Sequence, residues 1–99
     1  NFESCNILNN TANKEYGGGG VRVEPYGVAN FEGCNIHDNT AEWFGGGGVF
    51  VSSDGVANFE GCDIHDNTAL YGGGVYVAPN GVANFEGCDI HDNTADMSG

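Results

Sequence analysis

The sequence predicts an all-β protein, a right-handed parallel β-helix in which each repeat forms one coil of a solenoid. The first observation is repetition: residues 55–69 and 81–95 both read GVANFEGCDIHDNTA, and residues 27–41 differ only at Asn35. The second is the alternation of apolar and polar side chains within each repeat, which is typical of half-buried strands. The third is the set of glycine-containing turn sequences that separate these stretches.

The repeat length excludes other common repeat folds. Each repeat holds one cysteine: Cys5, Cys34, Cys62 and Cys88. These cysteines are 29, 28 and 26 residues apart. Leucine-rich repeats share this length but need a column of leucines, and the chain has only Leu8 and Leu70. Propeller blades need about 40 residues or more. A parallel β-helix remains, because its coils stack about 4.8 Å apart and bring equivalent residues into contact.

Residues 1–99 are expected to form a single domain of about three and a half coils, and each coil is expected to hold three short strands and three bends. The expected coils are residues 1–26, 27–54, 55–80 and 81–99. The first bend is EPYG, SSDG or APNG, whose final glycine tolerates a positive φ. The second is the dipeptide EG, and the third is DNTA together with the glycine run that follows it. Because neither end shows a cap, we expect further coils, or other copies of the chain, to stack end to end.

Equivalent residues are expected to form columns, or ladders, along the solenoid. The apolar interior columns are Phe2/Phe31/Phe59/Phe85, Cys5/Cys34/Cys62/Cys88, Ile7/Ile36/Ile64/Ile90, Ala12/Ala41/Ala69/Ala95, Val21/Val49/Val75 and Val23/Val51/Val77. A polar column is Asn10/Asn39/Asn67/Asn93, for which we expect a hydrogen-bonded asparagine ladder at a bend. Burying a Val, Ile or Phe side chain stabilises a fold by about 1.5–3 kcal/mol, so these columns can form the core.

The cysteine column has two interpretations. No C-x-x-C pair occurs, which excludes zinc-ribbon and thioredoxin-like sites. We favour buried free thiols, because cysteine packs well as a small apolar residue. Vertical disulfides between adjacent coils are the alternative, since stacked α-carbons about 4.8 Å apart lie within the range that disulfides allow.

The chain is strongly acidic, with a net charge of −12 and only two basic residues, Lys14 and Arg22. Binding to a phosphate backbone requires clustered Lys and Arg, so we expect no nucleic-acid partner. Anionic membrane surfaces are disfavoured for the same reason, and no apolar run is long enough to cross a membrane.

Two short motifs carry a resemblance to a known family. GGGVYV (72–77) and IHDN (64–67) are similar to the paired GGA-I and F-x-x-N motifs of the polymorphic outer-membrane protein repeat. In this chain Gly stands for Ala, and Ile for Phe. The resemblance implies a right-handed β-helical passenger segment of a cell-surface adhesin or autotransporter, and therefore an extracellular or cell-surface location.

The stretch DIHDN is the best candidate binding surface. It places Asp63 beside His65 on the outer face, with Asp89 and His91 in the next coil. Mixed imidazole and carboxylate sets bind Zn²⁺ or similar ions, and added carboxylates suit Ca²⁺. We favour a solvated polar face here, with no cofactor beyond a weakly bound Ca²⁺ or Zn²⁺.

Aromatic residues near the glycine runs are a second candidate, for surface glycans or a partner chain. They are Tyr16, Trp43, Phe44 and Tyr71. Phe50 and Tyr76 follow the glycine runs and are expected on the outer face. Ring stacking within the sheet is the interpretation that we favour for these residues.

We therefore expect a non-enzymatic extracellular structural module, a rigid stalk or filament subunit. A catalytic site should break the repeat, and no such set of residues stands out. A polysaccharide lyase would need more basic residues than this chain has. The alternative function is an adhesin module that binds a carbohydrate or a divalent metal through the aromatic or His/Asp face.

Overall fold

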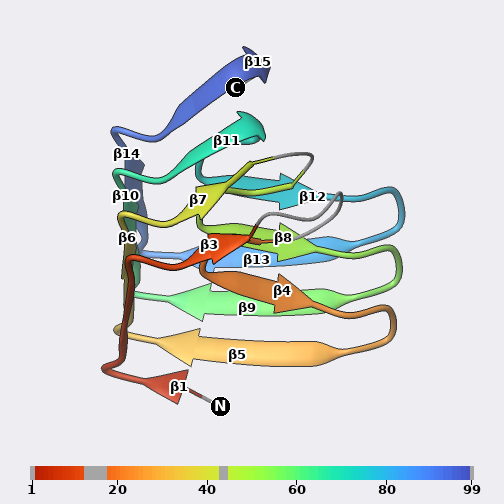
Figure 1. The fold of residues 1–99 in the computed structure, drawn as a ribbon. Helices are drawn as coiled ribbons and strands as arrows, with labels where there is room; N and C mark the ends of the chain where they lie inside the picture. Colours follow the sequence, from red (N-terminus) through yellow and green to blue (C-terminus); the bar gives the residue numbers. More distant parts are fainter. Residues whose placement is uncertain (1, 13–17, 43–44, 99) are drawn as a thin grey trace.

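The computed structural model describes residues 2–12, 18–42 and 45–98, which form strands and turns without a helix. All strand pairs are parallel, and four sheets run along the molecule (Figure 1). The first sheet contains β1 (Phe2–Glu3), β5 (Val28–Glu32), β9 (Val56–Glu60) and β13 (Val82–Glu86). The second contains β2 (Asn6–Leu8), β6 (Asn35–His37), β10 (Asp63–His65) and β14 (Asp89–His91). The third contains β3 (Thr11–Ala12), β7 (Thr40–Ala41), β11 (Thr68–Tyr71) and β15 (Thr94–Ser98), and the fourth β4 (Val21–Val23), β8 (Val49–Val51) and β12 (Val75–Val77).

The predicted parallel solenoid is confirmed. Strands β1–β4, β5–β8 and β9–β12 make three coils, and β13–β15 begin a fourth. The expectation of three strands per coil is wrong, because the described residues of each complete coil form four. The additional strand starts within DNTA, which was expected to be a bend. Asp66 turns the chain with a φ of 54°, so Thr68 and Ala69 are already extended and pair with Thr40 and Ala41.

The register joins equivalent residues of successive coils. Phe31 pairs with Phe59, and Phe59 with Phe85, so that their rings stack 4.8 Å apart. Ile36, Ile64 and Val49 are fully buried beside them. Alternation within strands sends these apolar residues inward, and hydrophobic burial of the resulting columns stabilises the stack.

The predicted asparagine ladder is confirmed in the interior. Asn39 and Asn67 are fully buried, and Nδ2 of Asn39 donates to Oδ1 of Asn67 over 3.0 Å. The same Oδ1 accepts from the backbone N–H of Asn39 at 2.9 Å, and Nδ2 of Asn67 donates to the Ile36 carbonyl at 3.0 Å. Each buried amide therefore makes hydrogen bonds with backbone groups where the chain turns. These bonds offset the cost of burying a polar side chain.

The corners depend on residues with positive φ. Gly61 lies at the EG bend with a φ of 61°, as expected. At the APNG turn, in contrast, the expected glycine is not the residue with positive φ. Asn80 holds a φ of 66°, and the N–H of Gly81 donates to the Ala78 carbonyl at 2.9 Å. Position 81 requires glycine because there is no room for a side chain: a Cβ there would lie 2.9 Å from the Ser52 carbonyl oxygen.

The glycine run brings backbones into close contact. A Cβ at Gly47 would lie 2.3 Å from the Gly73 carbonyl oxygen and 2.7 Å from the Thr68 nitrogen. No real side chain fits in such a space. The run is therefore required where the segment before β8 passes the third sheet.

Candidate functional site

The outer face of the second sheet carries a column of histidines. Strands β6, β10 and β14 present His37, His65 and His91, whose rings stack with centroids 4.9 and 5.1 Å apart. The alternation that buries Ile36 and Ile64 turns the neighbouring side chains of these strands outward. The face that was expected from DIHDN is thus built by three successive coils.

Each imidazole contacts the aspartate that follows it. The Nδ1–Oδ2 distances are 2.6 Å for His37–Asp38, 2.7 Å for His65–Asp66 and 2.8 Å for His91–Asp92. The other ring nitrogen reaches the preceding coil: Nε2 of His65 lies 3.0 Å from Oδ1 of Asn35, and Nε2 of His91 lies 3.0 Å from Oδ1 of Asp63. His65 and His91 therefore link successive coils, and all three histidines also contact the aspartate at the following bend.

The electrostatics of His91 favour the imidazolium form. The hydrogen bond with Asp92 raises the pKa of His91, and the hydrogen bond with Asp63 adds to this effect. In the imidazolium form both ring nitrogens donate to carboxylate oxygens, so neither then offers a lone pair to a metal ion. In the part of the chain that the structure describes, no group of three or more His, Cys, Asp or Glu side chains is arranged to hold a metal ion. The structure shows the candidate metal ligands Asp63, His65, Asp89 and His91 along two neighbouring strands, β10 and β14.

Of the aromatic candidates, Tyr16, Trp43 and Phe44 lie outside the described residues. Tyr71 lies half-buried at the end of β11, where the register with β15 shifts. Phe50 and Tyr76 stack with centroids 5.4 Å apart, and the Arg22 guanidinium lies 5.8 Å from the centre of the Phe50 ring. Phe50 is only 4% exposed, because it lies between Arg22 and Tyr76 in the register of the fourth sheet.

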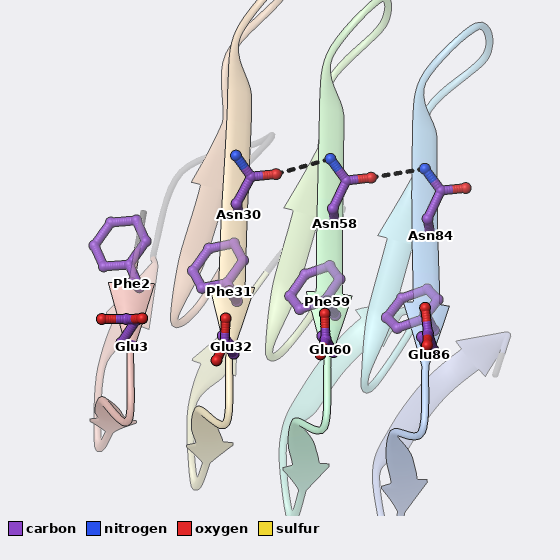
Figure 2. Close-up of a pocket in the computed structure, with 11 residues that line it drawn as sticks. Phe2, Glu3, Asn30, Phe31, Glu32, Asn58, Phe59, Glu60, Asn84 and Glu86 are labelled. Atoms are coloured by element: carbon purple, nitrogen blue, oxygen red, sulfur yellow. Dashed lines mark hydrogen bonds between the residues drawn. The ribbon is translucent and has the colours of Figure 1, made fainter.

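The first sheet carries a groove that the sequence analysis did not anticipate (Figure 2). It has a volume of about 570 Å³. Its polar lining consists of two columns, Asn30/Asn58/Asn84 and Glu3/Glu32/Glu60/Glu86. Nδ2 of Asn58 donates to Oδ1 of Asn30 at 2.8 Å, and Nδ2 of Asn84 donates to Oδ1 of Asn58 at 2.7 Å. The signal was present in the sequence: NFE recurs in all four repeats, and alternation places its Asn and Glu on the same face.

The described residues contain no helix with the length and apolarity needed to span a membrane. A family model described as a right-handed beta helix region matches residues 1–98. Searches of curated proteins and of solved structures found no match for the chain.

Proposed function

Because the chain belongs to the right-handed β-helix family, we propose that it is a rigid structural segment of an extracellular or cell-surface stalk or filament. The observation that carries this proposal is the identity of the layers. Strand β9 pairs with β5 on one side and with β13 on the other. In each pairing, all five residue pairs join identical residues. A stack of identical layers extends without a change in geometry, which suits a straight rod.

The proposed role is non-enzymatic. Catalysis needs a set of side chains that departs from the repeat, whereas the hydrogen-bonded polar groups described above are themselves repeated columns. The asparagine and histidine columns bond to their own equivalents or to their neighbours in the adjacent coil. The similarity of GGGVYV and IHDN to the repeats of polymorphic outer-membrane proteins supports a passenger segment of an adhesin or autotransporter.

Electron microscopy of the purified protein, together with X-ray diffraction of oriented material, tests this role. We expect threads or short rods of constant width, with an axial spacing of about 4.8 Å. Ile64→Asp, at a fully buried position of the isoleucine column, should abolish them, whereas His65→Gln on the same strand should leave them intact. Particles without this axial spacing, or depolymerisation of an acidic polysaccharide by the protein, would refute the proposal.

The groove on the first sheet favours a second candidate, an adhesin module that binds surface glycans. Its exposed amide column offers hydrogen bonds at a regular spacing to a polar polymer. Binding on a glycan array that Asn58→Ala weakens, and that His65→Gln on the second sheet leaves unchanged, would support this candidate. An array without a reproducible signal would exclude it.

A further inference from the structure

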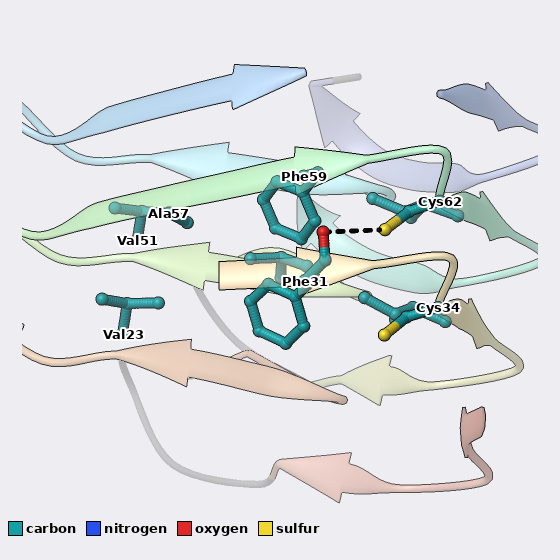
Figure 3. Close-up of a cluster of buried hydrophobic side chains, with 10 residues drawn as sticks. Val23, Phe31, Cys34, Val51, Ala57, Phe59 and Cys62 are labelled. Carbon is teal, nitrogen blue, oxygen red and sulfur yellow. Dashed lines mark hydrogen bonds between the residues drawn. The ribbon is translucent and has the colours of Figure 1, made fainter. Parts of the chain in front are cut away.

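The interior contains a column of four thiols. Cys34 and Cys62 are each 2% exposed (Figure 3), Cys5 and Cys88 are half-buried, and all four are free. Successive cysteines lie side by side, because the residue after each one donates its N–H to the cysteine carbonyl of the preceding coil. These bonds are Asn35 N–H to Cys5 at 2.8 Å, Asp63 N–H to Cys34 at 2.9 Å and Asp89 N–H to Cys62 at 3.0 Å.

The four sulfur atoms have the same orientation. Each Sγ contacts the carbonyl oxygen of the glutamate two residues earlier, at 3.3 Å in Cys5, 3.6 Å in Cys34, 3.5 Å in Cys62 and 3.5 Å in Cys88. Side chains with the same orientation on stacked coils repeat at the strand spacing. Neighbouring sulfurs are therefore separated by about 4.8 Å.

This separation suits a metal ion better than a disulfide. A disulfide would bring the sulfurs to about 2.05 Å and would require the side chains to leave their common orientation. Two metal–thiolate bonds in line, each of about 2.3 Å, span about 4.6 Å. An ion held in line between two sulfurs of the column must accept two sulfur ligands. Thiolates select soft ions such as Cu(I).

We propose that adjacent thiols of this column bind Cu(I), with one ion between Cys5 and Cys34 and a second between Cys62 and Cys88. This pairing uses every thiol once, which gives two ions per chain. Each ion displaces two thiol protons and leaves a bis-thiolate complex with one negative charge. The N–H of Cys62, which contacts Sγ of Cys88 at 3.4 Å, stabilises that charge. Because each ion displaces thiol protons, uptake should weaken as the pH falls.

Anaerobic titration of the reduced protein with Cu(I), in competition with a colorimetric chelator, measures the number of ions bound. We expect two ions per chain, two protons released per ion, and two sulfur neighbours by X-ray absorption. Two double variants provide a matched comparison, because each keeps two thiols. Cys5→Ala/Cys88→Ala keeps the adjacent pair and should bind one ion, whereas Cys34→Ala/Cys62→Ala separates the remaining thiols and should bind none.

Circular dichroism during the titration shows whether the chain stays folded. Two ions bound with an unchanged β spectrum, and the stated difference between the variants, would support the site. The first variant alters only half-buried positions and keeps the test decisive if the second fails to fold. The proposal is overturned if the folded protein takes up no Cu(I), if the two folded variants bind equally, or if uptake requires loss of the β spectrum.

Discussion

The EPYG turn contains a residue whose side chain is poorly suited to its backbone. Tyr26 holds a φ of 63° at the third position of the turn, where the N–H of Gly27 donates to the Glu24 carbonyl at 2.9 Å. The equivalent residues in the next coils are Asp54 and Asn80. Asn and Asp adopt this left-handed conformation more readily than other non-glycine residues, which pay about 1–2 kcal/mol for it. The tyrosine ring is 82% exposed, so little packing offsets this cost.

Tyr26→Asn should therefore stabilise the fold by about 1 kcal/mol, measured as the free energy of unfolding in urea. Tyr26→Phe is the control, because phenylalanine keeps the ring and gains no preference for positive φ. Equal stabilities of the two variants would show that the turn is not strained.

Strand β14 is tied to β10 by a bond that depends on protonation. Because His91 has a raised pKa in the folded protein, the folded state binds its proton more tightly than the unfolded chain. The resulting stabilisation is fully present below the unfolded pKa of about 6.5 and is lost as the pH rises through the folded pKa. The groups facing this ring are Asp92, Asp63 and the stacked His65.

The substitution His91→Gln should lower the melting temperature at about pH 6, and this effect should decrease towards about pH 9, because the imidazole loses its proton as the pH rises through the folded pKa. Thermal denaturation followed by circular dichroism at both pH values measures this difference. An effect of the same size at both pH values would mean that the ring contributes by packing rather than by charge.

The first sheet carries a ladder of like charges. Glu32 pairs with Glu60, and Glu60 with Glu86, so carboxylates face each other at every step. Like charges directly opposite on neighbouring strands are destabilising. Salt weakens such repulsion between exposed groups.

We expect Glu60→Gln, which removes the central charge, to raise the free energy of unfolding by about 0.2–1 kcal/mol. The gain should shrink at high salt, whereas the wild-type protein should become more stable there. Urea denaturation at low and high ionic strength measures both effects. A gain that does not change with salt would contradict the electrostatic explanation.

The whole molecule is held together by contacts between neighbouring coils. Stability in such a stack is approximately a sum over coil interfaces, and fewer than three coils rarely fold alone. Asn67 lies in the third coil and bonds both to Asn39 and to Asn93. A substitution at Asn67 therefore weakens the interfaces of the third coil with both neighbouring coils.

Asn67→Ala should destabilise the protein by about 3 kcal/mol or more, because it removes the buried acceptor of the Asn39 N–H groups and a donor to the Ile36 carbonyl. Asn58→Ala removes an amide from the exposed ladder, where water replaces the lost bonds, and should cost less than about 1 kcal/mol. Urea unfolding of both variants provides the comparison. If both substitutions lowered the free energy of unfolding by similar amounts, burial would not explain the contribution of the inner ladder to stability.

The sequence by itself determined the solenoid and the side of the chain that each column occupies. The period places equivalent residues one above another, and alternation separates Phe59 and Ile64 inside from Asn58 and His65 outside. Both signals are local, and they can be read without coordinates.

Only the tertiary structure decided how the corners turn and which groups meet between coils. The fourth strand, the positive φ of Asn80 and the bond from His91 to Asp63 depend on backbone geometry at the bends and on the register of residues 26–29 positions apart. A repeat pattern shows which side chains point inward and which point outward. The backbone angles at the bends and the distances between side chains of neighbouring coils are set only when the coils pack together.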